Sequence, residues 1–163
     1  MKSHNSGVTL EPITAENRPA YARFEEGFAS VLTPFMSRLH PNRYEEYEML
    51  IRQNLLRWFY IVADEKRIGS IWLEKEHPQD RSAVLGLFLF DEHYRALGIG
   101  ETVIRRILRE QKDALNLSEV ILRVRVTNPR GIRCYEKCGF HEVGRGIGHT
   151  GVEGIEMKKL LME

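Results

Sequence analysis

The sequence has few cysteines that could cross-link it, no long apolar segment that could anchor it in a membrane and no apolar run near its start that could direct its export. Only 2 of its 163 residues are cysteine, and a domain of this size buries roughly 70% of its unfolded surface without a disulfide framework. Its longest stretch without a formal charge, residues 27–37, is 11 residues long, whereas a membrane helix needs about 20 apolar residues. Residues 1–6 lead into no apolar run, so we expect no secretory signal, no membrane association and a cytoplasmic protein.

Charge is nearly balanced in total but uneven along the chain. The 24 lysines and arginines against 23 aspartates and glutamates leave a net charge of +1, which excludes a generally basic coat for nucleic acid. Residues 1–94 carry a net charge of −3, residues 95–140 one of +5 and residues 141–163 one of −1. An anionic ligand therefore suits the middle segment and a cationic one suits the first.

Hydrophobic periodicity predicts a single domain over residues 1–163, because no repeat, linker or low-complexity tract interrupts it. Strands are predicted at residues 8–13, 58–63, 67–75, 83–90 and 120–128, with two more within 141–161. Helices are predicted at residues 15–32, 41–55, 98–115 and 129–138. The order βααβββαβαββ is typical of a mixed α/β or α+β fold with a central antiparallel meander.

Turn signals and one apolar strand refine this prediction. Asp64-Glu65-Lys66 is expected to join two strands as a hairpin. Residues 83–90 are nearly all apolar, which predicts a central strand buried on both faces. Pro34 and Asn116 are expected to end the first and third helices.

The first segment with chemical content is Arg95-Ala96-Leu97-Gly98-Ile99-Gly100, between the apolar strand and the long helix. Its glycines let the backbone approach a ligand at the helix N-terminus, where unpaired N–H groups and the helix dipole favour a pyrophosphate. Glycines that merely allow a tight turn are the alternative. Because Glu101-Thr102 follows, the segment is not a P-loop, and because Val103 stands where a third glycine is needed, a dinucleotide-binding oxidoreductase is disfavoured.

A second segment, residues 128–140, reads Asn-Pro-Arg-Gly-Ile-Arg-Cys-Tyr-Glu-Lys-Cys-Gly-Phe. The Arg-x-x-Gly-x-Gly loop, followed in the next strand–helix unit by Asn-x6-Tyr-Glu-Lys-x-Gly-Phe, resembles the GCN5-related N-acetyltransferases, the GNAT family. The element order agrees over essentially the full chain. The resemblance implies the acyl-CoA N-acyltransferase fold, a twisted and mostly antiparallel sheet of about seven strands flanked by helices, with acetyl-CoA as cosubstrate.

The resemblance also implies a cofactor site in a V-shaped opening between the fourth and fifth strands. The backbone of Phe88, Leu89 and Phe90 is implied to pair with the pantetheine arm and to orient the acetyl group. The pyrophosphate loop is implied to comprise Arg95, Ala96, Leu97, Gly98, Ile99 and Gly100, with backbone donors from residues 97–100. Asn128 is implied to hydrogen-bond the cofactor arm, and a polar turn before Pro129 is the alternative.

Tyr135 is implied to be the general acid that protonates the departing CoA thiolate. An aromatic core residue is the alternative. The general base is unassigned, because many relatives that acetylate protein N-termini carry a glutamate five residues before the asparagine, where this chain has Arg123. Glu74 and Glu76 share one face of the predicted third strand with Trp72 and are candidates that act through water, with exposed solvated carboxylates as the alternative.

Three further features, the cysteines, the histidines and Gly131, are not assigned a chemical role. Cys134 and Cys138 share one face of the predicted helix, and packing beneath it is favoured over a thiol nucleophile or a zinc pair because no histidine motif accompanies them. The 6 histidines of the chain lack ligand spacing, so we expect no metal. Gly131 stands where alanine is common and is expected only to weaken the helix slightly.

The sequence therefore predicts an enzyme that moves acetyl from acetyl-CoA to a primary amine of a small molecule or protein, by direct attack in a ternary complex. Residues 35–47 are expected to shape the acceptor site, but their composition does not identify the substrate. A non-catalytic acyl-CoA-binding or regulatory module is the alternative, disfavoured by Tyr135 with Asn128 and favoured by the missing base. The resemblance leaves a homodimer open.

Overall fold

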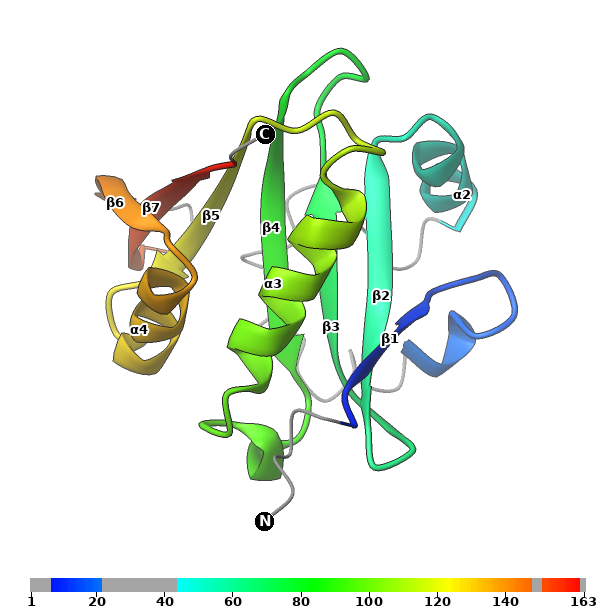
Figure 1. Ribbon diagram of the computed structural model, residues 1–163, viewed down its shortest axis with the longest axis horizontal. Helices are drawn as coiled ribbons and strands as arrows, with labels where there is room; N and C mark the ends of the chain where they lie inside the picture. The colour runs from blue at the N-terminus through cyan, green and yellow to red at the C-terminus, as the bar shows by residue number, and fades with distance from the viewer. Residues whose placement is uncertain (1–6, 22–43, 148–150, 162–163) are drawn as a thin grey trace.

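Seven strands form one sheet in the computed structural model, which describes residues 7–21, 44–147 and 151–161 (Figure 1). In sequence order they are β1 Thr9–Pro12, β2 Leu56–Ala63, β3 Lys66–Glu74, β4 Ser82–Leu89, β5 Glu119–Arg125, β6 His141–Ile147 and β7 Glu153–Leu160. Their spatial order is β1-β2-β3-β4-β5-β7-β6. Every neighbouring pair is antiparallel except β4 and β5, which are parallel. The predicted mixed α/β fold with a mostly antiparallel seven-stranded sheet is confirmed.

The labelled helices are α2 Tyr44–Arg52, α3 Ile99–Gln111 and α4 Pro129–Lys137, and a short 3-10 helix, η1, spans Glu92–Tyr94. Figure 1 shows α3 lying across the sheet in front of β3 and β4, with α4 beside β5 and β7. Within the described segments, no helix combines the length and apolarity that a membrane crossing requires.

The main core lies between α3 and one face of the sheet. From α3, Val103, Ile104 and Ile107 are fully buried, and each such aliphatic side chain stabilises the fold by about 1.5–3 kcal/mol through burial. They pack against Val120, Leu122 and other apolar residues of the sheet. The opposite face carries a second, aromatic cluster of Tyr21, Trp58, Tyr60, Trp72 and Phe90, with Ile13 and Leu56.

The β5 strand has the alternation that the sequence predicts. Val120, Leu122 and Val124 are buried in the main core, whereas Arg123 between them is exposed. Period-two alternation puts successive side chains on opposite faces of a strand. β5 borders β4 on one edge and β7 on the other.

The predicted hairpin between β2 and β3 is confirmed. Asp64 and Glu65 form its two-residue turn with φ values of 52° and 62°, the left-handed pair that a type I′ turn requires. Its twist matches that of the flanking strands, so β2 and β3 pair over their whole length, with one irregularity between Ile61 and Val62.

Several helix bounds differ from the predicted ones. The predicted helix 98–115 ends at Gln111, because the chain then turns to bury Leu115 and Leu117, with the Leu117 N–H donating to Lys112 O at 2.9 Å. The predicted helix 41–55 ends at Arg52, since Asn54 takes a φ of 58°. Of the predicted helix 15–32, residues 19–21 are helical. Its remainder, Pro34 and most of residues 35–47 lie outside the described residues.

The prediction that β4 is buried on both faces is wrong. Ala83 and Leu85 are buried, but Val84 is 41% exposed and residues 86–89 are only partly buried. Loss of the β5 neighbour is not the reason for Val84, because Val84 still pairs with Ile121 of β5. Ala83 and Leu85 point to the face that α3 covers, whereas Val84 points to the other face of the sheet, which leaves it exposed there.

Lys75 directly follows β3 and is buried, and its ammonium group donates hydrogen bonds to two loops. Its Nζ donates to Pro78 O and to Leu115 O, each at 2.8 Å, and burial lowers the pKa of its ammonium. Lys75→Met leaves two carbonyls without this donor, so we expect the free energy of unfolding to fall by about 2 kcal/mol. Urea denaturation measures the change. Lys66→Met, at an exposed lysine of β3, is the control and is expected to stay within about 0.5 kcal/mol of the wild type.

Candidate active site

The parallel strands β4 and β5 separate soon after they begin. Over the described residues β5 pairs only with Ser82–Val84 of β4, opposite Glu119–Ile121. β3 continues along the other edge of β4 as far as Leu89 opposite Gly69. Figure 1 shows the two parallel strands side by side at one end of the sheet and apart at the other. β4 and β5 therefore diverge, as the implied V-shaped opening between the fourth and fifth strands requires, and the edge of β4 at residues 85–89 has no partner strand on the β5 side within the described residues.

The sequence-predicted cofactor strand residues lie at the open end of β4. Phe88 and Leu89 are the last two residues of the strand, and each is partly buried. Phe90 follows the strand and is 7% exposed, with its N–H donating to Ile68 O at 2.7 Å. Phe88 and Leu89 also pair with β3, opposite Ser70 and Gly69. Because hydrogen-bonded pairs alternate along an antiparallel ladder, Phe88 bonds towards β3 as Phe90 does, and the backbone N–H and C=O of Leu89 point to the β5 side of the strand.

The glycine loop leads from this open end into α3. Ala96 and Gly98 both have positive φ, 64° and 78°, and Gly98 starts the helix with no side-chain cap. An N-terminus without a side-chain cap offers its first N–H groups to an anion, which the positive end of the helix dipole also favours. Leu97 is 37% exposed, and Ile99 is buried in the main core. The buried side chain of Ile99 thus attaches the loop to the core, whereas Leu97 and Gly98 are exposed to solvent.

The Arg95 side chain interacts with residues next to the loop. Its Nη2 donates to Leu89 O at 3.2 Å, and its Nη1 lies 3.8 Å from a Glu92 carboxylate oxygen. The guanidinium therefore joins the start of the loop to the end of β4. Contact of this side chain with a phosphate stays a prediction.

The N-terminus of α3 packs directly on α4. A Cβ at Gly100 would lie 3.0 Å from Cys134 Sγ, tighter than an ordinary contact. The Cys138 thiol lies 4.0 Å from Glu101 O. Gly100 thus allows the two helices to approach closely, and a side chain there would require Cys134 to shift, in addition to limiting any approach to a ligand.

The interpretation of the cysteines as packing residues is confirmed. Both are free, Cys138 is buried and Cys134 is partly buried between α3 and α4. The hydrogen bond to Cys138, together with burial, raises the pKa of the Cys134 thiol. Cys134 therefore stays protonated at neutral pH and is a poor nucleophile. The same hydrogen bond lowers the pKa of the Cys138 thiol, but that side chain is 1% exposed and is packed in the main core. Among the described residues no group of three histidine, cysteine or carboxylate side chains is placed to hold a metal ion.

Asn128 caps α4. Its Oδ1 accepts the Gly131 N–H at 3.0 Å, so the structure shows the turn role that was the alternative for this residue. Its contact with the cofactor arm stays a prediction. Gly131 matters more than the sequence indicated, because a Cβ there would lie 2.5 Å from Asn128 Nδ2. The cap and the glycine therefore depend on each other.

Tyr135 lies in the last turn of α4 and is partly buried. Its ring meets that of Phe140 edge to face, with centroids 6.1 Å apart and an interplanar angle of 67°. Burial raises the pKa of its hydroxyl, with the neighbouring thiols adding to the effect. A phenol with a raised pKa holds its proton through the neutral range, which is the state a general acid needs.

The two candidate bases have different surroundings. Glu74 is only 5% exposed, so the exposed alternative is wrong for it, whereas Glu76 lies beyond the end of β3 and is exposed. Glu74 and Trp72 do share one face of β3, the face opposite α3. Arg123 on β5 is exposed and stands opposite Glu156 of β7. Sequence reasoning missed the burial of Glu74 because alternation along a strand assigns a residue to a face and does not show how far the folded chain covers that face.

A parallel strand pair that opens beside a glycine-started helix is the arrangement implied above for an acyl-CoA N-acyltransferase. The chain belongs to the acetyltransferase (GNAT) family, whose sequence model matches residues 15–140.

Relatives with known names agree with this assignment. Spermidine N(1)-acetyltransferase of Vibrio cholerae is 32% identical over 111 residues, which cover 68% of this chain and 64% of that protein. N-alpha-acetyltransferase of Sulfurisphaera tokodaii is 44% identical over 52 residues, which cover 32% of this chain and 31% of that protein. The chain thus spans just under two thirds of the first relative and about a third of the second.

Solved structures share the fold over nearly the whole chain. Spermidine N-acetyltransferase from Vibrio cholerae, in complex with CoA and spermine, superposes with a TM-score of 0.75 at 24% identity. The match covers 95% of this chain and 96% of that one. The fold comparison therefore covers nearly the whole chain, whereas the sequence relatives match parts of it.

Proposed function

We propose that this chain forms one N-acetyltransferase domain that transfers acetyl from acetyl-CoA to a primary amine of a small, polyamine-like cation. The observation that supports the activity is the divergence of β4 from β5 after Val84, with the uncapped N-terminus of α3 at the end where the strands diverge. This place suits an elongated cosubstrate with a polyphosphate at one end.

The residues around the opening fit acetyl-CoA. The free edge of β4 at residues 85–89 offers backbone groups to the pantetheine arm, as a further strand would. Leu97, Gly98 and Gly100 present backbone N–H groups for the pyrophosphate, and Gly98 has no side chain to obstruct it. Acetyl-CoA, when bound, supplies the activated acetyl thioester. The cofactor roles proposed for Phe88, Leu89, Phe90, Arg95, Ala96, Ile99 and Asn128 follow the same placement.

Tyr135 is the proposed general acid. Its hydroxyl keeps its proton because burial raises its pKa, and α4 carries it beside the α3 N-terminus through the Gly100–Cys134 contact. The amine nitrogen bonds to the acetyl carbon, the C–S bond to CoA breaks, and the departing thiolate takes the proton of the Tyr135 hydroxyl. The nitrogen loses one proton to water, and the Tyr135 phenolate regains a proton from water, so that the enzyme returns to its starting state.

A polyamine-like acceptor is favoured over a protein N-terminus. The similarity to spermidine N(1)-acetyltransferase covers 68% of this chain, whereas that to the N-alpha-acetyltransferase covers 32%. Arg123 replaces the β5 glutamate common in N-terminal acetyltransferases, and it is exposed opposite Glu156 rather than held as a base. The net charge of −3 over residues 1–94 also suits a cationic acceptor.

The test is an acetyl-CoA-dependent screen of the full chain in which release of the CoA thiol is measured. Spermidine, spermine and putrescine are compared with monoamines, amino acids, peptides with free N-termini and lysine peptides. We expect the polyamines to give the highest kcat/KM. Calorimetric titration with CoA, run in parallel, measures cofactor binding independently of turnover.

Three results would contradict the proposal, each at a different point. A higher kcat/KM for peptide N-termini would move the acceptor class to proteins. CoA binding with no turnover of any amine would favour the non-catalytic module. No binding of CoA would overturn the cofactor site itself. The homodimer stays a prediction.

A further inference from the structure

The C-terminal end of α4 is built to hold Tyr135 in place. The Phe140 N–H donates to Tyr135 O and the Gly139 N–H to Glu136 O, each at 3.0 Å, and Gly139 takes a φ of 95°. This pair of bonds is the Schellman motif, including its usual apolar contact, here between the rings of Tyr135 and Phe140. The backbone turn that carries Tyr135 is therefore the helix terminus itself.

Two carbonyls of this helix terminus take no part in the motif. A cationic side chain from another element donates a hydrogen bond to each of them. Arg105 of α3 donates from Nη2 to Lys137 O at 2.6 Å. Lys159 of β7 donates from Nζ to Cys138 O. Positive groups at a helix C-terminus also interact favourably with the helix dipole. The last turn of α4 is thus held from α3 on one side and from the sheet on the other.

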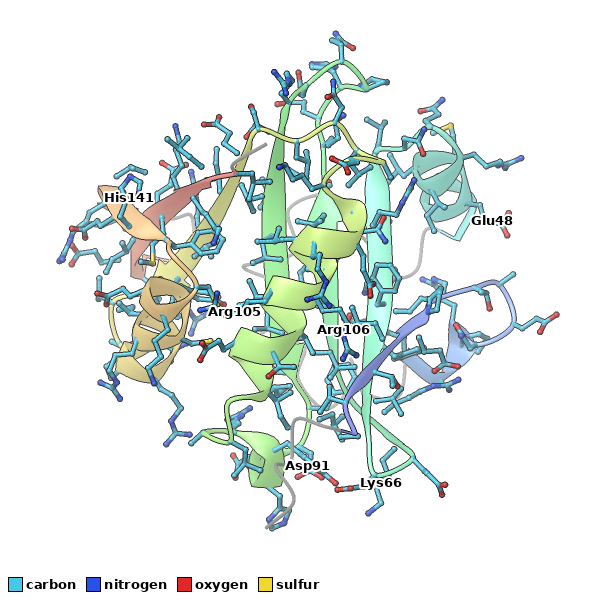
Figure 2. The ribbon with its side chains drawn as sticks, in the orientation of Figure 1. Glu48, Lys66, Asp91, Arg105, Arg106 and His141 are labelled. Carbon is cyan, nitrogen blue, oxygen red and sulfur yellow. The ribbon has the colours of Figure 1, made fainter. Side chains whose placement is uncertain are left out.

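Arg105 connects this turn to the cofactor loop. The same Nη2 lies 3.0 Å from Glu101 Oε1, and Nε lies 3.3 Å from that oxygen. Glu101 is in the first turn of α3, next to Gly100. Figure 2 shows Arg105 between α3 and α4, on the other side of α3 from its neighbour Arg106, which donates to Val8 O instead. One side chain therefore spans from the proposed pyrophosphate-binding turn to the turn that bears Tyr135.

We propose that Arg105 is a positioning residue for the transfer reaction, assisted by Lys159. By bonding Lys137 O and Glu101 together it sets the last turn of α4, and hence the Tyr135 hydroxyl, relative to the N-terminal turn of α3. This inference rests on the proposed role of Tyr135 as general acid. Arg105 itself touches no reacting atom, so its effect on the rate passes through Tyr135.

Arg105→Met retains the length of the side chain and removes every donor. The Arg105 side chain is 51% exposed, so the fold does not depend on its burial. We expect kcat to fall about fivefold, since small displacements of a catalytic group are costly, while the dissociation constant of CoA changes little. Arg105→Lys, which keeps one donor, is expected to recover part of the loss. Arg109→Met, one turn further along the same helix face at an exposed arginine, is the matched control and is expected to leave kcat unchanged.

A double-mutant cycle with Tyr135→Phe separates positioning from a general structural effect. If Arg105 acts through Tyr135, Arg105→Met lowers kcat in the wild-type background and has almost no further effect in Tyr135→Phe. Equal fold losses in both backgrounds would overturn the proposal. A kcat that does not change on Tyr135→Phe alone would instead show that the assigned acid is wrong.

Amide hydrogen exchange gives a readout that needs no turnover. In the free protein, Arg105→Met is expected to speed exchange of the Cys138, Gly139 and Phe140 amides, whose bonds close the last turn of α4, and to leave the middle of α3 unchanged. The same exchange rates in wild type and variant would overturn the positioning role, even for a chain that turned over no amine at all.

Discussion

Tyr135→Phe is expected to lower kcat by about a hundredfold, because loss of a positioned general acid removes about that much rate. The change deletes one oxygen and keeps the ring that packs on Phe140 at 6.1 Å. We therefore expect the dissociation constant of CoA and the unfolding midpoint to stay close to the wild-type values. Steady-state kinetics with the best amine of the screen, together with CoA titration, measure both quantities.

The pH profile provides the second part of this test. Burial raises the pKa of the Tyr135 hydroxyl, so its acid form persists above the ordinary tyrosine value of about 10. The wild-type kcat should accordingly show no loss from this group until strongly alkaline pH, and that alkaline limb should be missing in Tyr135→Phe. Tyr94→Phe is the control: it removes a hydroxyl that bonds Asp64 at 2.9 Å and is expected to leave kcat almost unchanged. An unaltered kcat and pH profile in Tyr135→Phe would exclude Tyr135 as the acid.

Gly100→Val should weaken CoA binding roughly ten- to hundredfold, the effect of about 1–3 kcal/mol of overpacking. A Cβ at this position would lie 3.0 Å from Cys134 Sγ and 3.5 Å from Leu87 Cδ2, and valine adds two more methyl groups. The first turn of α3 must then move away from α4 and β4. Because the proposed pyrophosphate donors are on that turn, binding of CoA should report the displacement directly in a calorimetric titration.

Two further variants identify the cause of the expected loss. Cys134→Ala removes the sulfur on the other side of the contact, so the double variant should regain part of the affinity for CoA. Gly146→Val, at a β6 glycine with no atom within 4 Å of an added Cβ, is expected to bind CoA like the wild type. If the loss on Gly100→Val is the same with and without Cys134, the helix contact is not its cause.

Much of the fold could be predicted from local pattern. The β5 strand alternates cleanly between Val120, Leu122 and Val124 on one face and arginines on the other, and the structure shows that alternation. The turn at Asp64 and Glu65 forms where the sequence predicts it. Period-two alternation and turn chemistry are short-range properties, so they can be recognised without the folded structure.

Helix ends were predicted less well. The helix that begins at Ile99 stops at Gln111 although helical spacing continues to Leu115. Leu115 and Leu117 are both buried, but from a turn rather than from a helix. Apolar spacing shows that a residue faces the core, and it cannot distinguish the last turn of a helix from a loop that also reaches the core.

The candidate site likewise combines features that local motifs predict with features that only the folded chain shows. The sequence by itself determined the glycine loop at residues 95–100, the position of Asn128 before a helix and Tyr135 within it, because each is a local motif of residue types. Only the tertiary structure decided that β5 leaves β4 after Val84, that Glu74 is buried and that Arg105 and Lys159 meet the end of α4. These features depend on contacts between residues far apart in the chain, and such contacts follow from how the strands and helices pack rather than from the order of neighbouring residues.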